Sequence, residues 1–385
     1  MKDFKTILRE YAKVDTSVRK AAVATVVRVR GSSYRSPGAR MLITDDGRWV
    51  GSISGGCLEG DALRKARQVM IDNKPITVTY DTNEDSNQNL GIGLGCNGII
   101  DVLIEPIDAN VKLNSIGLFK SLVDIQQPAA LATIFTGPDN VGAKRVIINK
   151  EKDHVESSIQ HPFLGWLIEH KLEKLFETRQ SYSESFTVQN QTWEVFLELV
   201  QPGFSLIIFG GGFDARPVSQ LAKSLGWDVQ VTDECAAHIA PLFFPTADKL
   251  SLCQRQFIDR DFNITPYTAC VLMSHNYEYD RDVLKKLVNT TAPYIGIMGP
   301  KKRFDKMLND FAKDGVKLTD EQLSRIHSPI GLDIGAEAPD EIAVAIISEI
   351  QARFSNRGGG FLKERDGAIH ERDANSDQVF KQIYF

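Results

Sequence analysis

A glycine-rich turn between an apolar strand pattern and a helical pattern constrains the fold of this chain most strongly. Residues 210–215 read GGGFDA and fit the pattern G-x-G-x-x-A directly after the apolar stretch 205–209. Asp233 follows the next predicted strand, 227–232, and lies 23 residues after the first glycine. Such glycines permit a tight turn and close approach to a pyrophosphate, and the acidic residue could accept ribose hydroxyls. The pattern predicts a Rossmann-like fold.

Strand and helix patterns continue to alternate after this unit, as expected for a doubly wound parallel sheet. The segments that match strand or helix patterns in turn are 270–273, 281–288, 294–297, 301–313 and 340–354. We therefore expect a Rossmann-like C-terminal domain over residues 196–356. The polar, glycine-rich segment 357–385 is expected to form an extended arm.

The first half of the chain has a different pattern and predicts a mixed α/β domain over residues 1–195. It combines amphipathic helical segments with strands rich in β-branched residues, and Asp46-Gly47 is typical of a hairpin turn. The helical segments are 2–14 and 58–71, and the strands are 21–29, 40–44, 48–53, 76–80 and 99–105.

Composition excludes several classes of protein. The 45 basic and 50 acidic residues give a formal charge of -5, which does not favour binding to nucleic acid or to an anionic membrane surface. We find neither a signal peptide nor an apolar run of the roughly 18 residues that a membrane helix needs. The five cysteines form no C-x-x-C pair. We therefore expect a reduced, cytoplasmic protein without a disulfide framework.

Two cysteines lie in glycine-rich runs. Cys57 ends the run GSISGGC, with Gly55 and Gly56 before it and a predicted helix after it, and Cys96 lies in GIGLGCNG. A lone cysteine is more often core filler, but small neighbours favour an accessible thiol, and a helix start stabilises a thiolate. The two thiols could meet as soft metal ligands.

The other cysteines lack such neighbours, so we expect Cys235, Cys253 and Cys270 to be structural. His275 follows the strand pattern 270–273 at its C-terminal end, where open α/β sheets place their ligands. An alternative is that its neighbours Ser274 and Asn276 simply cap the next helix. The sequence leaves these two interpretations open.

Three long motifs occur in order along the chain: GSSYRSPGARM at 31–41, GSISGGCLE at 51–59 and IHSPIGLDIGAE at 326–337. With the Rossmann unit, they resemble the XdhC/CoxI family of xanthine dehydrogenase accessory factors. The resemblance implies a maturation protein that holds molybdenum cofactor and passes it to an apo molybdenum hydroxylase, such as xanthine or carbon monoxide dehydrogenase. It also implies Cys57 and Cys96 as candidate molybdenum ligands, a cysteine desulfurase as a second partner, and a homodimer.

On this interpretation the chain is a maturation chaperone rather than an enzyme. An NAD(P)-dependent oxidoreductase stays open, because the glycine pattern and Asp233 favour it although no Tyr-x-x-x-Lys relay is present and Asp214 would repel a phosphate. A catalytically silent assembly scaffold also stays open. The candidate cofactor-binding residues are Gly55, Gly56, Cys57, Cys96, Gly210, Gly212, Asp233 and His275.

Overall fold

The computed structural model describes residues 1–81, 98–111, 113–138, 144–149 and 154–366. The chain forms two compact units that divide after Pro202. The boundary expected between residues 195 and 196 falls inside strand β10 (Gln191–Val200) of the first unit. Among the residues described, no helix is both long enough and apolar enough to span a membrane.

The first unit contains two five-stranded antiparallel sheets, with strand orders β3-β2-β1-β5-β4 and β8-β7-β6-β10-β9. The expected hairpin is present, since the Thr44 amide donates to the Arg48 carbonyl across the Asp46-Gly47 turn. The strands of the first sheet are β1 (Ala21–Gly31), β2 (Arg40–Thr44), β3 (Trp49–Gly51), β4 (Ile76–Asp81) and β5 (Gly98–Pro106). Those of the second are β6 (Ala129–Thr136), β7 (Lys144–Asn149), β8 (His154–Ser157), β9 (Tyr182–Val188) and β10.

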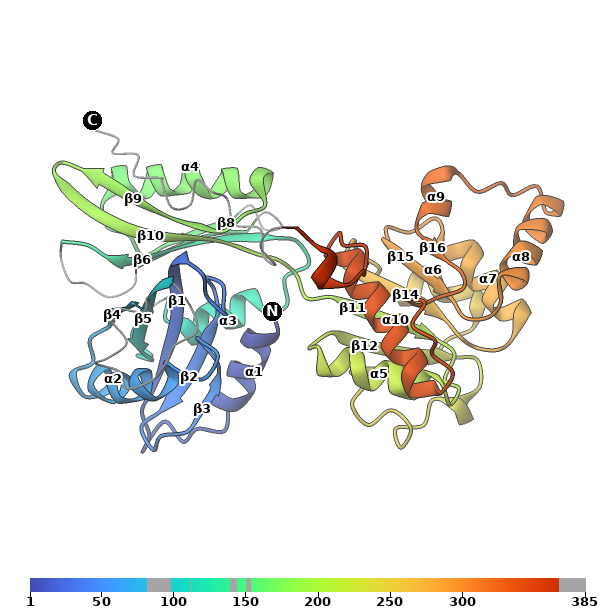
Figure 1. Cartoon of the computed structure of the whole chain (residues 1–385), viewed down its shortest axis with the longest axis horizontal. Helices are drawn as coiled ribbons and strands as arrows, with labels where there is room; N and C mark the ends of the chain where they lie inside the picture. Colours follow the sequence, from blue (N-terminus) through green and yellow to red (C-terminus); the bar gives the residue numbers. More distant parts are fainter. Residues whose placement is uncertain (82–97, 112, 139–143, 150–153, 367–385) are drawn as a thin grey trace. The chain divides into compact units, whose positions relative to one another are not determined.

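Four helices cover these sheets: α1 (Lys2–Tyr11), α2 (Glu59–Asp72), α3 (Ser115–Leu122) and α4 (Pro162–Thr178). Residues of β1 alternate between two cores. Ala22 and Ala24 pack in the cluster that contains α2, whereas Ala21 and Val23 pack with α1 and α3. In Figure 1, α4 lies along the second sheet, and its buried leucines pack against β6 and β10. Both faces of β1 are therefore buried, which explains its nearly continuous apolar sequence.

The second unit is a six-stranded parallel sheet with the order β13-β12-β11-β14-β15-β16. Counted along the chain this is the order 3-2-1-4-5-6, which confirms the predicted Rossmann-like domain and places its switch point between β11 and β14. The strands are β11 (Ser205–Phe209), β12 (Asp228–Asp233), β13 (Lys249–Leu252), β14 (Thr268–Leu272), β15 (Tyr294–Ile297) and β16 (Ile326–His327).

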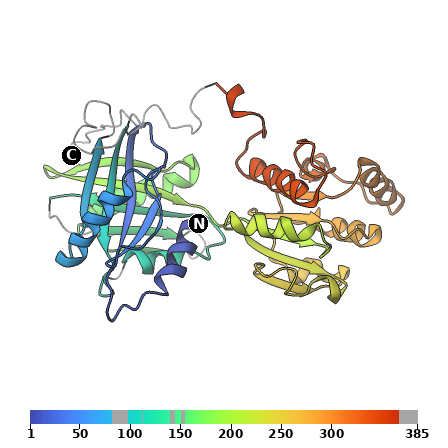
Figure 2. The ribbon, with the colours of Figure 1, turned by 60° about the horizontal axis from the view of Figure 1, so that its bottom comes forward.

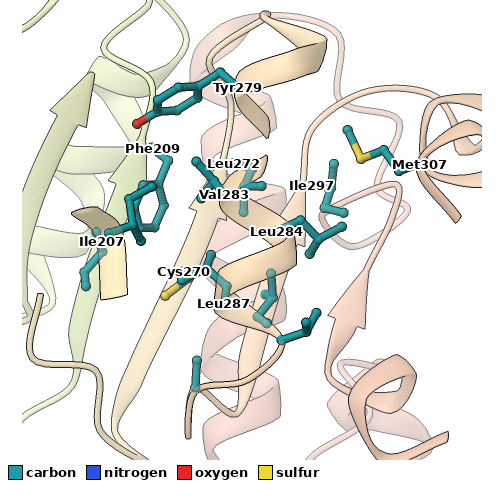
Figure 3. Close-up of a cluster of buried hydrophobic side chains, with 14 of the residues drawn as sticks. Ile207, Phe209, Cys270, Leu272, Tyr279, Val283, Leu284, Leu287, Ile297 and Met307 are labelled. Carbon is teal, nitrogen blue, oxygen red and sulfur yellow. The ribbon is translucent and has the colours of Figure 1, made fainter. Parts of the chain in front are cut away.

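Helices cover this sheet on both faces (Figure 2). One apolar cluster joins the strands to α5 and α10, and another joins them to α6, α7 and α8. The second cluster contains Phe209 and Leu272 from the strands, Val283 from α7 and Met307 from α8 (Figure 3). Cys270 is fully buried among them, in keeping with the structural role we expect for it. The helices are α5 (Ala215–Ser224), α6 (Ile258–Asp261), α7 (Tyr277–Leu287), α8 (Lys301–Lys313), α9 (Asp320–Ser324) and α10 (Pro339–Phe354).

Candidate functional site

Cys57 lies in the loop that joins β3 to α2. Its side chain is half-buried against the apolar cluster beneath α2, while Gly55 and Gly56 before it are exposed. Gly56 has a φ of +114°, a conformation that favours glycine, and a Cβ added there would meet no atom within 4 Å. The glycine is therefore needed for the path of the backbone, and there is open space at this point of the loop.

The buried carboxylate of Glu59 holds this loop in place. Its Oε1 accepts hydrogen bonds from the Ser52 hydroxyl at 2.8 Å and from the amides of Ile53 and Ser54, while its Oε2 accepts the Ser54 hydroxyl at 2.5 Å. Burial would raise the pKa of Glu59, but the hydrogen bonds from Ser54 and Ser52 bring it below its usual value. The charged carboxylate therefore anchors the segment just before Cys57.

The Ser54 hydroxyl extends this network toward Cys57. It accepts hydrogen bonds from the amides of Gly56 and Leu58, both at 3.1 Å. Leu58 is the N-cap residue of α2, and Cys57 precedes it. Loop amides on either side of Cys57 thus already have partners within the loop, which fixes the backbone that carries the thiol.

Two residues from the segment between β1 and β2 lie beside the loop, and both are exposed. The ring of Tyr34 lies 3.1 Å from the Cβ position of Gly55, and the Arg35 Nε donates to the Ser54 carbonyl at 3.4 Å. The sequence motif contained both residues, but its pattern gave them no role. An exposed aromatic ring and a guanidinium beside a cysteine loop can bind a heterocycle and an anionic group.

The second candidate ligand, Cys96, lies outside the described residues, so its pairing with Cys57 stays a prediction. Gly98, two residues later, pairs with Gly31 at the start of β5. Within the described part of the chain, no group of three or more His, Cys, Asp or Glu side chains could hold a metal ion. A ligand role for Cys57 therefore stays a prediction as well.

The other candidates lie at the C-terminal edge of the parallel sheet. Gly210 has a φ of +119°, and a Cβ there would lie 2.4 Å from the backbone of Ser274 after β14, so only glycine fits. The ring of His275 lies 3.5 Å from the Cβ position of Gly212, and its Nε2 lies 3.5 Å from the Asp214 carboxylate. His275 is exposed and has a φ of +60°, an uncommon backbone conformation for this residue type.

The capping interpretation is confirmed for Asn276, whose side chain accepts hydrogen bonds from the amides of Glu278 and Tyr279 at the start of α7. Ser274 has a different partner, because its hydroxyl donates to the buried carboxylate of Asp280 at 2.5 Å. These contacts do not involve the imidazole of His275, so a ligand role for that side chain stays a prediction.

Asp233 ends β12, as the sequence predicts, and its carboxylate bonds to nearby groups of the same unit. Oδ2 accepts the Gly211 amide at 2.8 Å and lies 3.1 Å from the Nδ1 of His238, while Oδ1 accepts the Cys235 amide at 2.8 Å. The sequence did not indicate a role for His238, which lies in the short turn after β12.

The structure brings the predicted residues together as two groups. Gly55, Gly56 and Cys57 share one loop in the first unit. The candidates of the second unit share the edge of the parallel sheet, and they are Gly210, Gly212, Asp233 and His275.

Comparisons with known proteins match both units. Residues 16–81 match the model of the XdhC and CoxI family, and residues 206–350 match that of the XdhC Rossmann domain. The chain is 29% identical over 331 residues to a Bacillus subtilis protein named as a probable xanthine dehydrogenase subunit, covering 86% of this chain and 92% of that protein. It is 22% identical over 349 residues to the Escherichia coli "Molybdenum cofactor insertion chaperone PaoD", covering 90% and 88%.

A solved structure is also similar over almost the whole chain. A crystal structure from Bacillus halodurans, described as a xanthine dehydrogenase, matches with a TM-score of 0.73 and 30% sequence identity, covering 93% of this chain and 97% of that one. Two domain models in the expected order and this end-to-end match agree with the motifs in the sequence. The chain belongs to the XdhC/CoxI family of xanthine dehydrogenase accessory factors.

Proposed function

We propose that this protein binds molybdenum cofactor at the Cys57 loop and delivers it to an apo molybdenum hydroxylase. The observation that carries the proposal is the similarity, along 90% of the chain, to a protein named as a molybdenum cofactor insertion chaperone. The similarity to a protein named as part of a xanthine dehydrogenase supports a client of that type. On this proposal the protein itself is a carrier rather than a catalyst.

The chemistry of the Cys57 loop suits this cargo. A cysteine thiolate is a soft ligand of the kind that molybdenum accepts, and the half-buried Cys57 is the one cysteine of the described residues in a glycine loop. The exposed Arg35 could bind the phosphate of the pterin, and the Tyr34 ring could lie against its heterocycle. The bound cofactor supplies the molybdenum centre that the client enzyme needs for hydroxylation.

The loop also suits a carrier that must release its cargo. Gly55 and Gly56 leave the backbone exposed beside the thiol, while the Glu59 carboxylate fixes the loop from the buried side. A preorganised loop loses little conformational entropy on binding, and an exposed one can transfer its ligand without unfolding. A cysteine desulfurase that supplies sulfur to the bound cofactor, and a homodimer of this chain, belong to the same proposal.

The test is the cofactor content of Cys57→Ser protein, purified from cells that make molybdenum cofactor. We expect the variant to fold normally and to lose at least about nine-tenths of its bound pterin and molybdenum, since an alcohol is a poor substitute for a thiolate. The matched control is Cys235→Ser, which changes an exposed cysteine in the other unit. Pterin fluorescence after oxidation and elemental analysis measure the content.

Equal cofactor content in Cys57→Ser and the parent protein would remove the ligand role of Cys57. Absence of cofactor from the parent protein, even when it is mixed with isolated cofactor, would instead favour the silent scaffold. Loss in both variants would show that the effect does not depend on the Cys57 loop.

A further inference from the structure

The Rossmann order and the glycine turn of the second unit imply a dinucleotide site, and three contacts define it in that fold. The pyrophosphate lies on the glycine turn and on free amides at the start of the following helix, and an acidic residue after the second strand accepts the ribose hydroxyls. In this chain the corresponding groups are Gly210 and Gly212, the first turn of α5, and Asp233.

The ribose acceptor is already occupied by groups of the same unit. Both oxygens of Asp233 accept backbone amides, one from Gly211 and one from Cys235, and the His238 imidazole lies 3.1 Å from Oδ2. The His238 carbonyl also lies 2.5 Å from the Cβ position of Gly211, so the turn after β12 packs directly on the glycine turn. This backbone contact holds the turn in place, so the His238 side chain stays beside the Asp233 carboxylate.

A second histidine lies beside the expected pyrophosphate position. The ring of His275 lies 3.5 Å from the Cβ position of Gly212, where close approach of a phosphate would otherwise be expected. Its Nε2 is 3.5 Å from Asp214, whose carboxylate lies at the N-cap of α5.

Two amides at the start of α5 already have partners within the turn. The amides of Ala215 and Arg216 bond to the carbonyls of Gly212 and Phe213 at 3.2 Å, as in a tight turn. A phosphate that used these two amides would have to break these bonds, and it would meet the negative charge of Asp214 at the N-cap of α5. These two amides are therefore not free for a phosphate, and the charge of Asp214 disfavours a phosphate at this helix start.

We infer that the glycine-rich edge of this Rossmann unit does not take a dinucleotide, because His238 and His275 occupy its ribose and pyrophosphate positions. The unit keeps the glycine turn for a structural reason: Gly210 and Gly211 let the segments after β14 and β12 pack against it. This disagreement between fold and residues counts against the oxidoreductase interpretation and is independent of cofactor binding at Cys57.

The experiment is titration calorimetry of the full chain with NAD+, NADH and NADP+. We expect no saturable binding of any of them up to about 1 mM, a limit that corresponds to about 4 kcal/mol of binding free energy. Saturable binding of any of these dinucleotides within that range overturns the inference.

A second arm tests the two histidines directly. In His238→Ala/His275→Gly we expect NAD+ to bind at least tenfold more tightly, within the measurable range, because both imidazoles are removed while Asp233 is kept. The single variant His275→Gly, which suits the positive φ, should show part of this gain. His170→Ala on α4 in the first unit is the matched control, and we expect it not to bind NAD+.

Thermal unfolding must show that each variant is folded. Folded double and single variants that bind NAD+ no better than the parent would show that the histidines are not what closes the site, and would overturn the inference. A gain of binding in His170→Ala would do the same.

Discussion

The carboxylate of Glu59 accepts both the amide and the hydroxyl of Ser54, at 3.0 and 2.5 Å, from the first turn of the helix that follows their loop. The first residue of α2 thus reaches back and fixes the loop that carries Cys57. A glycine-rich loop with two exposed glycines would otherwise lose much conformational entropy on ordering. The position of the thiol therefore depends on a residue whose side chain does not need to touch a ligand.

We predict that Glu59→Gln destabilises the first unit by about 1–3 kcal/mol, because buried donors of the loop lose a charged acceptor. Alkylation of Cys57 should become severalfold faster as the loop loosens. Thermal unfolding and the labelling rate of the Cys57 peptide measure the two effects. The control is Glu177→Gln, an exposed glutamate on α4. Unchanged Cys57 labelling would mean that Glu59 does not hold the loop.

The four cysteines of the described residues should differ strongly in reactivity. Cys235 is exposed, Cys57 is half-buried, and Cys253 and Cys270 are buried. Burial raises the pKa of the Cys253 thiol to about 11, with a further contribution from Asp261, and burial also raises the pKa of Cys270. At pH 8 a thiol with a pKa of about 11 is only about 0.1% thiolate.

We therefore predict that iodoacetamide at pH 8 labels Cys235 first and Cys57 next, and labels Cys253 and Cys270 only after unfolding. Peptide mass spectrometry over a time course gives the four rates. The same reaction in denaturant is the control, since all four thiols should then react at similar rates. Labelling of Cys270 in the native protein as fast as Cys235 would contradict the buried position of its side chain.

The Rossmann unit could be predicted from the sequence because its signals are local. The glycine turn, the short apolar strands and Asp233 all lie within about one βαβ repeat. The two-residue strand β16 was missed, since two residues carry no periodicity. The partners of Asp233 could not be predicted either, because the turn that brings His238 to it depends on packing rather than on the spacing of acidic residues.

The Cys57 loop could be predicted in part for a similar reason. Its glycines and cysteine are adjacent in the sequence, so the loop and the helix after it are visible as a pattern. The positions of Tyr34 and Arg35 are not visible, because they come from another connection and meet the loop only when β1, β2 and β3 pair. In the sequence, Glu59 is indistinguishable from the acidic residues that are common in the first turn of a helix. Its contact with Ser54 forms only in the folded loop.

Gly210→Ala should be strongly destabilising. The φ of +119° and the predicted 2.4 Å contact with the Ser274 backbone together should cost about 3 kcal/mol or more. Gly315→Ala is the matched control, since Gly315 also has a positive φ but would meet no atom within 4 Å, and should cost about 1–2 kcal/mol. Urea unfolding measures the loss of unfolding free energy in each variant. Equal losses in Gly210→Ala and Gly315→Ala would show that the contact with Ser274 can relax.

The last motif of the sequence contributes to a half-buried network around Glu349 of α10. Its carboxylate lies 2.9 Å from the Nδ1 of His327 and accepts the Tyr294 hydroxyl at 2.5 Å and the Gly331 amide at 2.7 Å. Burial would raise the pKa of Glu349, but these hydrogen bonds bring it below its usual value of 4.5. Burial, with a further contribution from the same carboxylate, raises the pKa of the Tyr294 hydroxyl. The network ties the edge of the sheet to α10.

This network predicts how the stability of the second unit changes with pH. The pKa of Glu349 is lower in the folded than in the unfolded chain. Its contribution to the free energy of unfolding is therefore present above about pH 4.5 and is lost as the pH falls further. Glu349→Gln should therefore lower the free energy of unfolding by about 1–3 kcal/mol at pH 7, and by progressively less below pH 4.5. Urea unfolding of parent and variant between pH 7 and pH 3 measures the difference, with Glu177→Gln as the control. A difference that stays constant or grows toward pH 3 would mean that the charge of Glu349 does not hold the network together.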